Sequence, residues 1–270
     1  MSDNQFEYRI EGSDLQFVQL TLAPGAKAVG EPGSMMYMDE AIQMDTVLGD
    51  GADEGFFARI GGAFKRMFTG ESMFSTLFIN PTNQPLRVAF AAPSPGKIVP
   101  IDLEENGGAI ICQKGAFLGG TQGVRVGVAF KKRLRVGFFG GEGFIMQKLT
   151  GSGIAFIHAS GTLSEQTLGP GDSLKVDTGC LAALQTSATY DIRYVGKVKT
   201  ALFGGEGLFF AHLKGPGQVW LQSLPVQRLA RGLFAHALSG RNRSPLGRIY
   251  LLLIVIFALF TLFADLGTQP

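Results

Sequence analysis

The alternation of apolar and polar positions predicts short β-strands through the first 225 residues. Residues Phe6 to Leu22 alternate well enough for two strands, 7–10 and 15–21, which are separated by a polar turn. The segment 124–130 alternates most clearly. Further strands are expected at 41–47, 73–79, 86–91, 98–103 and 109–112. Glycine and proline separate these runs, as in antiparallel sheets with tight turns, so the pattern predicts an all-β fold.

The pattern changes after Pro225. Apolar residues recur at helical spacing through 226–240, and Arg228 and Arg231 occupy the opposite face. Proline is favoured in the first turn of a helix, so Pro225 suits the start of this segment. We therefore expect an amphipathic helix at 226–240, followed by a basic linker at 241–248.

An uncharged apolar run, 249–264, follows the linker. A helix over this run spans roughly 24 Å at about 1.5 Å per residue, slightly less than a hydrocarbon core of about 30 Å. Snorkelling of Arg248 and local thinning of the bilayer can supply the difference. The run shows no polar face, so it predicts a transmembrane helix rather than a buried core helix.

A short motif occurs three times in the chain. FGGEG at 139–143 returns at 203–207 and, in weaker form, as FTGES at 68–72, with offsets of 71 and 64 residues. The motif places three glutamates in register: Glu71, Glu142 and Glu206. Upstream, Leu22, Pro24, Gly25 and Gly33 match Leu168, Pro170, Gly171 and Gly179 at a constant offset of 146. A fixed internal period indicates a repeat architecture.

The repeat divides the β body, 1–225, into units of about 22–97, 98–167 and 168–225. Each unit is too small to bury a generous core alone, so we expect the three to pack as one body. The 38 glycines and 22 phenylalanines among 270 residues also favour many short strands with tight turns.

Charge and cysteine content narrow the function classes. The net charge of +2 gives no large basic field for wrapping nucleic acid, so a nucleic-acid partner is not favoured. The two cysteines, Cys112 and Cys180, lie in apolar runs without CxxC spacing, and we expect buried free thiols. The polar N-terminus has no leader, which favours a cytoplasmic β body.

The arginines around the apolar run predict its orientation. Five of them precede the run, whereas only Asp265 is charged after it. The positive-inside rule then keeps the body in the cytoplasm and sends 265–270 across the membrane. We expect a tail-anchored, single-pass protein of the cell's inner (cytoplasmic) membrane.

Catalytic and metal-binding patterns receive little support. The glycine-rich segment GGTQG at 119–123 and the GGEG motifs match no phosphate-binding fingerprint and are interpreted as tight turns or bulges. The three aligned glutamates could meet on an axis as a metal site, or each could cap a turn, and the second interpretation is preferred. His158, His212 and His236 occupy different repeat positions. We therefore predict no enzyme activity, metal or cofactor.

Cations and aromatics come together before each glutamate motif. A threefold arrangement would bring these segments to one end of the body. They could face an anionic membrane surface, or the phenylalanines could fill the core while the cations are merely solvated. The candidate membrane-surface residues are Lys65, Arg66, Phe68, Arg133, Arg135, Phe138, Phe139, Lys197, Lys199 and Phe203.

The repeats resemble a known family, the mitochondrial-biogenesis proteins of the altered-inheritance-of-mitochondria class, which has bacterial members. The resemblance covers about residues 4 to 238. It rests on PGSMMYMD at 32–39, GGAFKRMFTGESMF at 61–74, FFGGEGFIMQKLTGSG at 138–153 and FGGEGLFFAHLKGPGQVWLQS at 203–223. It implies a fold like the tryptophan RNA-binding attenuator protein: three antiparallel β-sandwich units about a pseudo-threefold axis. It implies no catalytic residues, and RNA binding does not follow from the fold.

Two functions of different classes remain in view. The first is a non-enzymatic, membrane-tethered β scaffold that binds membrane lipid or a protein partner. The alternative is a ligand- or nucleic-acid-binding module that uses the basic and aromatic segments. The sequence specifies neither the partner nor the oligomeric state.

Overall fold

The computed structural model describes residues 6–48, 74–132, 144–194, 209–226, 228 and 230. The chain divides into two compact units, 1–227 and 228–270, and all the described strands belong to the first unit. The predicted all-β class is confirmed: the described part consists of antiparallel sheets and one short 3-10 helix, Thr178–Cys180.

The strands follow β1 (Phe6–Glu11) as three sets of six. Set 1 comprises β2 (Phe17–Leu22), β3 (Lys27–Gly30), β4 (Met35–Met38), β5 (Gln43–Leu48), β6 (Phe74–Ile79) and β7 (Leu86–Ala91). Set 2 comprises β8 (Gly96–Asp102), β9 (Ala109–Gln113), β10 (Phe117–Thr121), β11 (Val124–Lys132), β12 (Phe144–Gly151) and β13 (Ile154–Ser160). Set 3 comprises β14 (Leu163–Leu168), β15 (Ser173–Asp177), β16 (Leu181–Gln185), β17 (Thr189–Tyr194), β18 (Phe209–Lys214) and β19 (Gly217–Gln222).

The pairing order is the same in every set. The sixth strand lies between the first and third strands, as in β2-β7-β4, β8-β13-β10 and β14-β19-β16. The fifth strand lies between the fourth and second strands, as in β5-β6-β3, β11-β12-β9 and β17-β18-β15. Each third strand also has a register shift at the same place, between Met35 and Tyr37, Phe117 and Gly119, and Leu181 and Ala183. The threefold sequence pattern thus corresponds to a threefold pattern of strand pairing.

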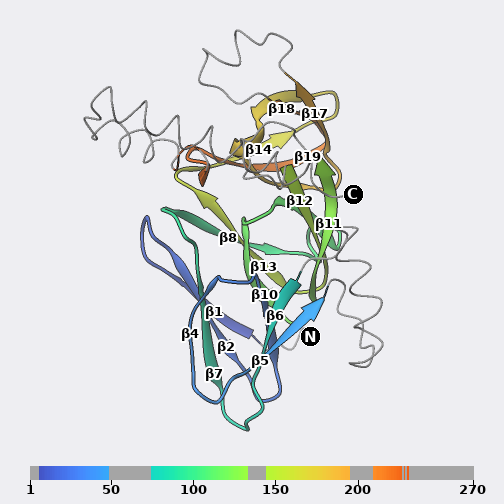
Figure 1. The fold of residues 1–270 in the computed structure, drawn as a ribbon. Coiled ribbons are helices and arrows are strands. Elements are labelled where there is room, and N and C mark those ends of the chain that lie inside the picture. The colour runs from blue at the N-terminus through green and yellow to red at the C-terminus, as the bar shows by residue number, and fades with distance from the viewer. Residues whose placement is uncertain are drawn as a thin grey trace, which may run out of the picture. The chain divides into compact units, whose positions relative to one another are not determined.

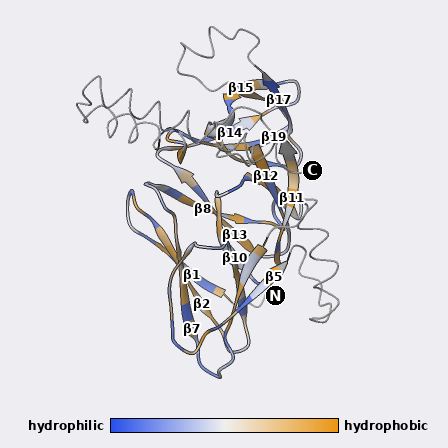
Figure 2. Cartoon of the chain, in the orientation of Figure 1, coloured by the Kyte–Doolittle hydropathy of each residue, from blue (hydrophilic) through white to orange (hydrophobic). Residues whose placement is uncertain are grey.

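Neighbouring sets share sheets. The second strand of one set pairs with the third strand of the next, as β3 with β10 and β9 with β16, which produces two six-stranded sheets. Figure 1 shows the first of these sheets running through β5, β6, β10 and β13. Among the described strands, the remaining second and third strands, β15 and β4, each pair on one side only. Hydrophobic residues recur along the strands of every set (Figure 2).

The core consists of three clusters, and each combines residues of neighbouring sets. One packs Val18, Leu20, Phe78 and Phe90, and the ring centroids of the two phenylalanines are 5.3 Å apart in an edge-to-face contact. The second cluster includes Ile110, Phe117 and Ile157, and the third includes Phe144, Leu184 and Leu213. In the described part of the chain, five phenylalanines are fully buried in these clusters: Phe78, Phe90, Phe117, Phe144 and Phe156.

Two glycines predicted to lie in a tight turn or a bulge lie inside a strand, at the register shift between Phe117 and Gly119. Gly119 and Gly120 belong to β10, and a Cβ on Gly119 would come within 2.8 Å of the Phe90 ring. A Cβ on Gly120 would come within 2.9 Å of Val124. Side-chain packing explains these glycines, whereas the turn itself is made at Gly123, whose φ is +103°.

Two predicted segments fall largely or wholly outside the described residues. Within 226–240, Val226, Arg228 and Ala230 are helical. The apolar run 249–264 lies wholly outside. In the part of the chain that the structure describes, no helix is long and apolar enough to cross a bilayer.

Candidate functional site

The candidate membrane-surface residues lie in three connections outside the described part of the chain: 49–73, 133–143 and 195–208. Each connection joins the fourth strand of a set to the fifth. Its flanking residues are directly paired, Leu48 with Phe74, Lys132 with Phe144 and Tyr194 with Phe209. The three motifs therefore leave the sheets from equivalent paired strand ends. The glutamates Glu71, Glu142 and Glu206 belong to these same connections.

The described part offers a different site, where the ends of the sixth strands β7, β13 and β19 meet. Ser94, just after β7, lies with its hydroxyl 2.7 Å from that of Ser160 at the end of β13. The Ser160 amide donates to the Gln222 side chain at the end of β19, at 2.9 Å. The Leu224 amide donates in turn to the Ser160 carbonyl at 3.1 Å. Hydrogen bonds therefore tie the three sets together at this point.

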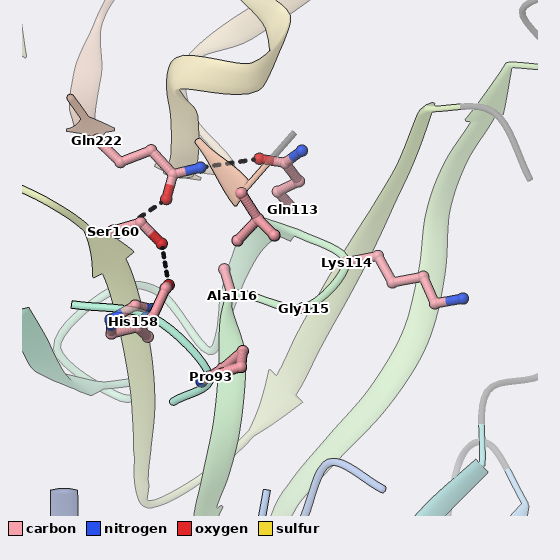
Figure 3. Close-up of a pocket in the computed structure, with 10 residues that line it drawn as sticks. Pro93, Gln113, Lys114, Gly115, Ala116, His158, Ser160 and Gln222 are labelled. Carbon is pink, nitrogen blue, oxygen red and sulfur yellow. Dashed lines mark hydrogen bonds between the residues drawn. The ribbon is translucent and has the colours of Figure 1, made fainter. Parts of the chain in front are cut away.

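A cavity of about 260 Å³, here called the polar cavity, opens beside these hydrogen bonds. Gln222 is buried and donates to the Gly179 carbonyl at 2.7 Å and to the Gln113 side-chain oxygen at 3.2 Å. Figure 3 shows Gln113, Ser160 and Gln222 joined in this way, with Lys114 extending away from them. The polar groups in the network are neutral and present hydrogen-bond donors and acceptors, while the lining of the cavity also includes the charged residue Lys114.

His158 lines the polar cavity and is only 3% exposed. Burial lowers its pKa from the ordinary value of 6.5, and a hydrogen bond to the Ser94 backbone opposes part of that shift. Its Nε2 atom has no hydrogen-bond partner, and a Cβ on Gly96 would come 2.5 Å from it. The neutral imidazole is therefore the form that suits this environment.

A second cavity, of about 420 Å³ and here called the Glu31 cavity, lies on the turn between β3 and β4. It shares Pro93 and Gly115 with the polar cavity. Glu31 is half-buried and accepts hydrogen bonds from the Gln147 amide at 3.2 and 3.4 Å. Burial raises the pKa of Glu31, while the Gln147 hydrogen bond and the positive charge of Lys114 lower it by smaller amounts.

The walls of the Glu31 cavity are mostly apolar. Met35 and Met36 are 39% and 55% exposed, although the aligned residues of set 2, Phe117 and Leu118, are 1% and 2% exposed. The remaining lining residues are Pro32, Gly33, Ser34, Ala91, Ala92, Pro93, Gly115, Phe117 and Leu118. The stretch PGSMM, which carried part of the family resemblance, thus forms one wall of a cavity with a single carboxylate.

The pairing register identifies equivalent positions of the three sets that the sequence patterns did not reveal. It aligns Glu31 with Gln113 and Asp177, each at or just beyond the end of a second strand. His158 and Gln222 are likewise equivalent, since the offset of 64 superposes AFIHAS on VWLQSL. The sequence carried one signal of this site: two aligned apolar runs each contain a polar residue at the same position.

The described residues contain no group of three His, Cys, Asp or Glu side chains arranged to hold a metal ion. The aligned glutamates lie outside this part, so the metal and turn-capping interpretations both stay predictions. Cys112 is a free, buried thiol, as predicted, whereas Cys180 is half-buried.

Comparison with known proteins adds three findings. Residues 8–224 match the model of the family described as mitochondrial biogenesis AIM24. The crystal structure of a Streptococcus pyogenes protein is similar, with 24% identity and a TM-score of 0.68, over 86% of this chain and 99% of that one. At this identity the likeness shows the fold. A search of curated proteins found no match.

Proposed function

Because the chain belongs to the AIM24 mitochondrial biogenesis family, whose name states no molecular activity, we propose a function from the arrangement of its own residues. The chain is a non-enzymatic β scaffold, tethered to a membrane by 249–264, that binds a lipid or protein partner through its three basic and aromatic segments. The observation that carries this proposal is the equivalence of the three strand ends from which those segments leave.

The charges of the segments support a membrane surface as the partner. Two cations lie within the six residues before each glutamate motif, and one or two phenylalanines accompany them. A cation close to an anionic leaflet contributes about 1 kcal/mol, and aromatic rings favour the headgroup level. Six cations presented together would thus give substantial, salt-sensitive attraction. The cations are Lys65, Arg66, Arg133, Arg135, Lys197 and Lys199.

The tail supports the tether and its direction. Residues 249–264 carry no charge, and arginines cluster before them. In this proposal the β body lies in the cytoplasm and the last six residues cross the inner membrane. Full-length protein should resist a carbonate wash of membranes, and a chain ending at Gly240 should be released. Full-length protein found wholly in the wash would refute the tether.

The pseudo-threefold arrangement is also part of the proposal. The pairings of β3 with β10 and of β9 with β16 leave β15 and β4 as the remaining equivalent edges. By the same register, Lys175 would oppose Met38, as Val29 opposes Gly120. This pairing would use Tyr37 to Asp39, and the Asp177 amide would approach the Met36 carbonyl as the Glu31 amide donates to the Leu118 carbonyl at 3.0 Å.

A cysteine pair tests this closure directly. Met38→Cys with Lys175→Cys should form a disulfide under mild oxidation, and the product should migrate as a monomer. A disulfide-linked dimer would assign the pairing to two copies of the chain. No cross-link in a folded protein would contradict the pairing of β4 with β15.

Liposome flotation tests the membrane surface separately from the tail. A chain ending at Gly240 should float with anionic vesicles at low salt, and much less with neutral vesicles or at high salt. Lys65→Glu, Arg66→Glu, Arg133→Glu and Arg135→Glu together should abolish flotation. The matched control changes four exposed lysines of the strands by the same total charge: Lys27, Lys148, Lys175 and Lys214. Equal flotation of both quadruple variants would support the alternative, in which the phenylalanines fill the core and the cations are merely solvated.

A second candidate function is ligand binding, and the Glu31 cavity is the observation that favours it. Its volume falls within the range of small-molecule sites, and it combines apolar walls with few polar groups. This function uses residues remote in sequence from the three connections. The two proposals can therefore fail independently.

A further inference from the structure

The Glu31 carboxylate is held in place but only partly satisfied by its protein donor. An ionised carboxylate can accept about four hydrogen bonds. The hydrogen bonds from Gln147 to its two oxygens, at 3.2 and 3.4 Å, are long for a charged acceptor. Capacity for a stronger donor therefore remains at this carboxylate, on the wall of the cavity.

Gln147 fixes the position of that carboxylate. Its side chain is fully buried on β12, and its oxygen accepts the Cys112 thiol proton at a sulfur–oxygen distance of 3.8 Å. This contact leaves the Gln147 amide directed at Glu31. The turn that carries Glu31 is fixed as well, because the Ser34 hydroxyl donates to the Leu118 carbonyl at 2.6 Å. The acceptor is thus preorganised, which reduces the cost of ligand binding.

Met35 and Met36 provide an apolar wall of the cavity. Both remain exposed on β4, whereas the residues aligned with them in sets 2 and 3 are almost completely buried. Methionine side chains are flexible and polarisable, so they adapt to apolar groups of varied shape. One charged acceptor beside an adaptable apolar wall is complementary to a molecule with a cationic head and an apolar chain.

We propose that the Glu31 cavity binds a small amphiphile that carries a protonated amine on an apolar chain. The ammonium group donates to the Glu31 carboxylate, and the chain lies against Met35 and Met36. The assignment develops the ligand-binding candidate above and does not depend on the membrane-surface proposal. Affinity falls at low pH, where the Glu31 carboxyl group becomes neutral. Burial raises the pKa of Glu31, while the Gln147 hydrogen bond and the positive charge of Lys114 oppose part of this shift.

Three probes of equal chain length test the head-group requirement: hexylammonium, hexanol and hexanoate. Calorimetric titration of the full-length chain should give the tightest binding for hexylammonium, at least about tenfold tighter than hexanol, and the weakest for hexanoate. Glu31→Gln keeps the side-chain shape and should remove the tenfold preference. Glu40→Gln, an exposed change in the neighbouring turn, should leave all three affinities unchanged.

The apolar contact needs its own variant. Met36→Ser removes an exposed side chain, so the fold should survive, and it should weaken hexylammonium and hexanol by a similar severalfold factor. Circular dichroism of each variant checks the fold. Equal affinity for hexylammonium and hexanol, or hexylammonium binding that is unchanged by Glu31→Gln, would overturn the proposal. Binding unaffected by Met36→Ser would equally overturn the placement of the apolar chain.

Discussion

Replacing Gln222 with leucine should destabilise the protein by about 3 kcal/mol. The substitution keeps a side chain of similar size but removes the acceptor of the Ser160 amide and the donor to the Gly179 carbonyl. Both backbone groups are buried, and each costs about 1–3 kcal/mol when left without a partner. The third hydrogen bond, to Gln113, is longer at 3.2 Å and contributes less.

The single tryptophan of the chain provides the assay. Trp220 is 4% exposed and lies two residues before Gln222 on β19, so its fluorescence follows unfolding of this region. With a urea dependence of about 2 kcal/mol per M, the midpoint should fall by roughly 1.5 M. Gln218→Leu is the control, because its side chain contacts Glu165 at the surface, and it should change stability by less than about 0.5 kcal/mol.

A loss below about 1 kcal/mol for Gln222→Leu would refute the claim that this network joins the three sets. Combining Gln222→Leu with Gln113→Leu refines the test. Because the two side chains share a hydrogen bond, their effects should be less than additive. Full additivity would show that this hydrogen bond contributes little to stability.

Three further predictions concern other buried groups. Because burial lowers the pKa of His158, the unfolded state binds more protons than the native state below about pH 6.5. The unfolding free energy should therefore decrease as the pH is lowered, by up to about 1.4 kcal/mol per pH unit. His158→Gln should remove this pH dependence, and identical pH profiles for the two proteins would contradict it. Gly96→Ala should lower the free energy of unfolding in urea by more than about 2 kcal/mol, because a Cβ would overlap the Ala159 carbonyl oxygen. Gly127→Ala should be nearly neutral, because the nearest atom to its Cβ would be 3.9 Å away. Burial raises the pKa of the Cys112 thiol, so iodoacetamide should label only the half-buried Cys180 in the native protein. Peptide mass mapping should detect labelling of Cys112 only under unfolding conditions.

The sequence predicted those parts of the fold that depend on local signals. Leu22 and Leu168, matched by the repeat, are the last residues of equivalent strands. The Pro-Gly pairs after them form the expected turns, with Gly25 and Gly171 at positive φ. These signals lie within a few residues of the structure they specify, and the alternating segment at 124–130 is similarly local.

Non-local packing explains what local signals could not provide. Gly119 indicates a turn or a bulge by composition, and the structure shows that it also leaves room for Phe90, which is distant in sequence. The candidate site is similarly assembled from separate segments, since Ser94, Ser160 and Gln222 meet only after the three sets have packed. The repeat identified equivalent segments but did not specify that neighbouring sets share sheets.

The shared sheets also bear on how such a chain could originate. A polypeptide only one set long would expose a second strand on one side and a third strand on the other, and these edges are complementary, as β3 with β10 and β9 with β16 demonstrate. Bare complementary edges pair with further copies, so such a polypeptide would assemble head to tail. Three copies joined end to end would convert contacts between molecules into contacts within one, at a high effective concentration. Each copy could then change its own turns and cavities separately, as the difference between Glu31 and Gln113 illustrates.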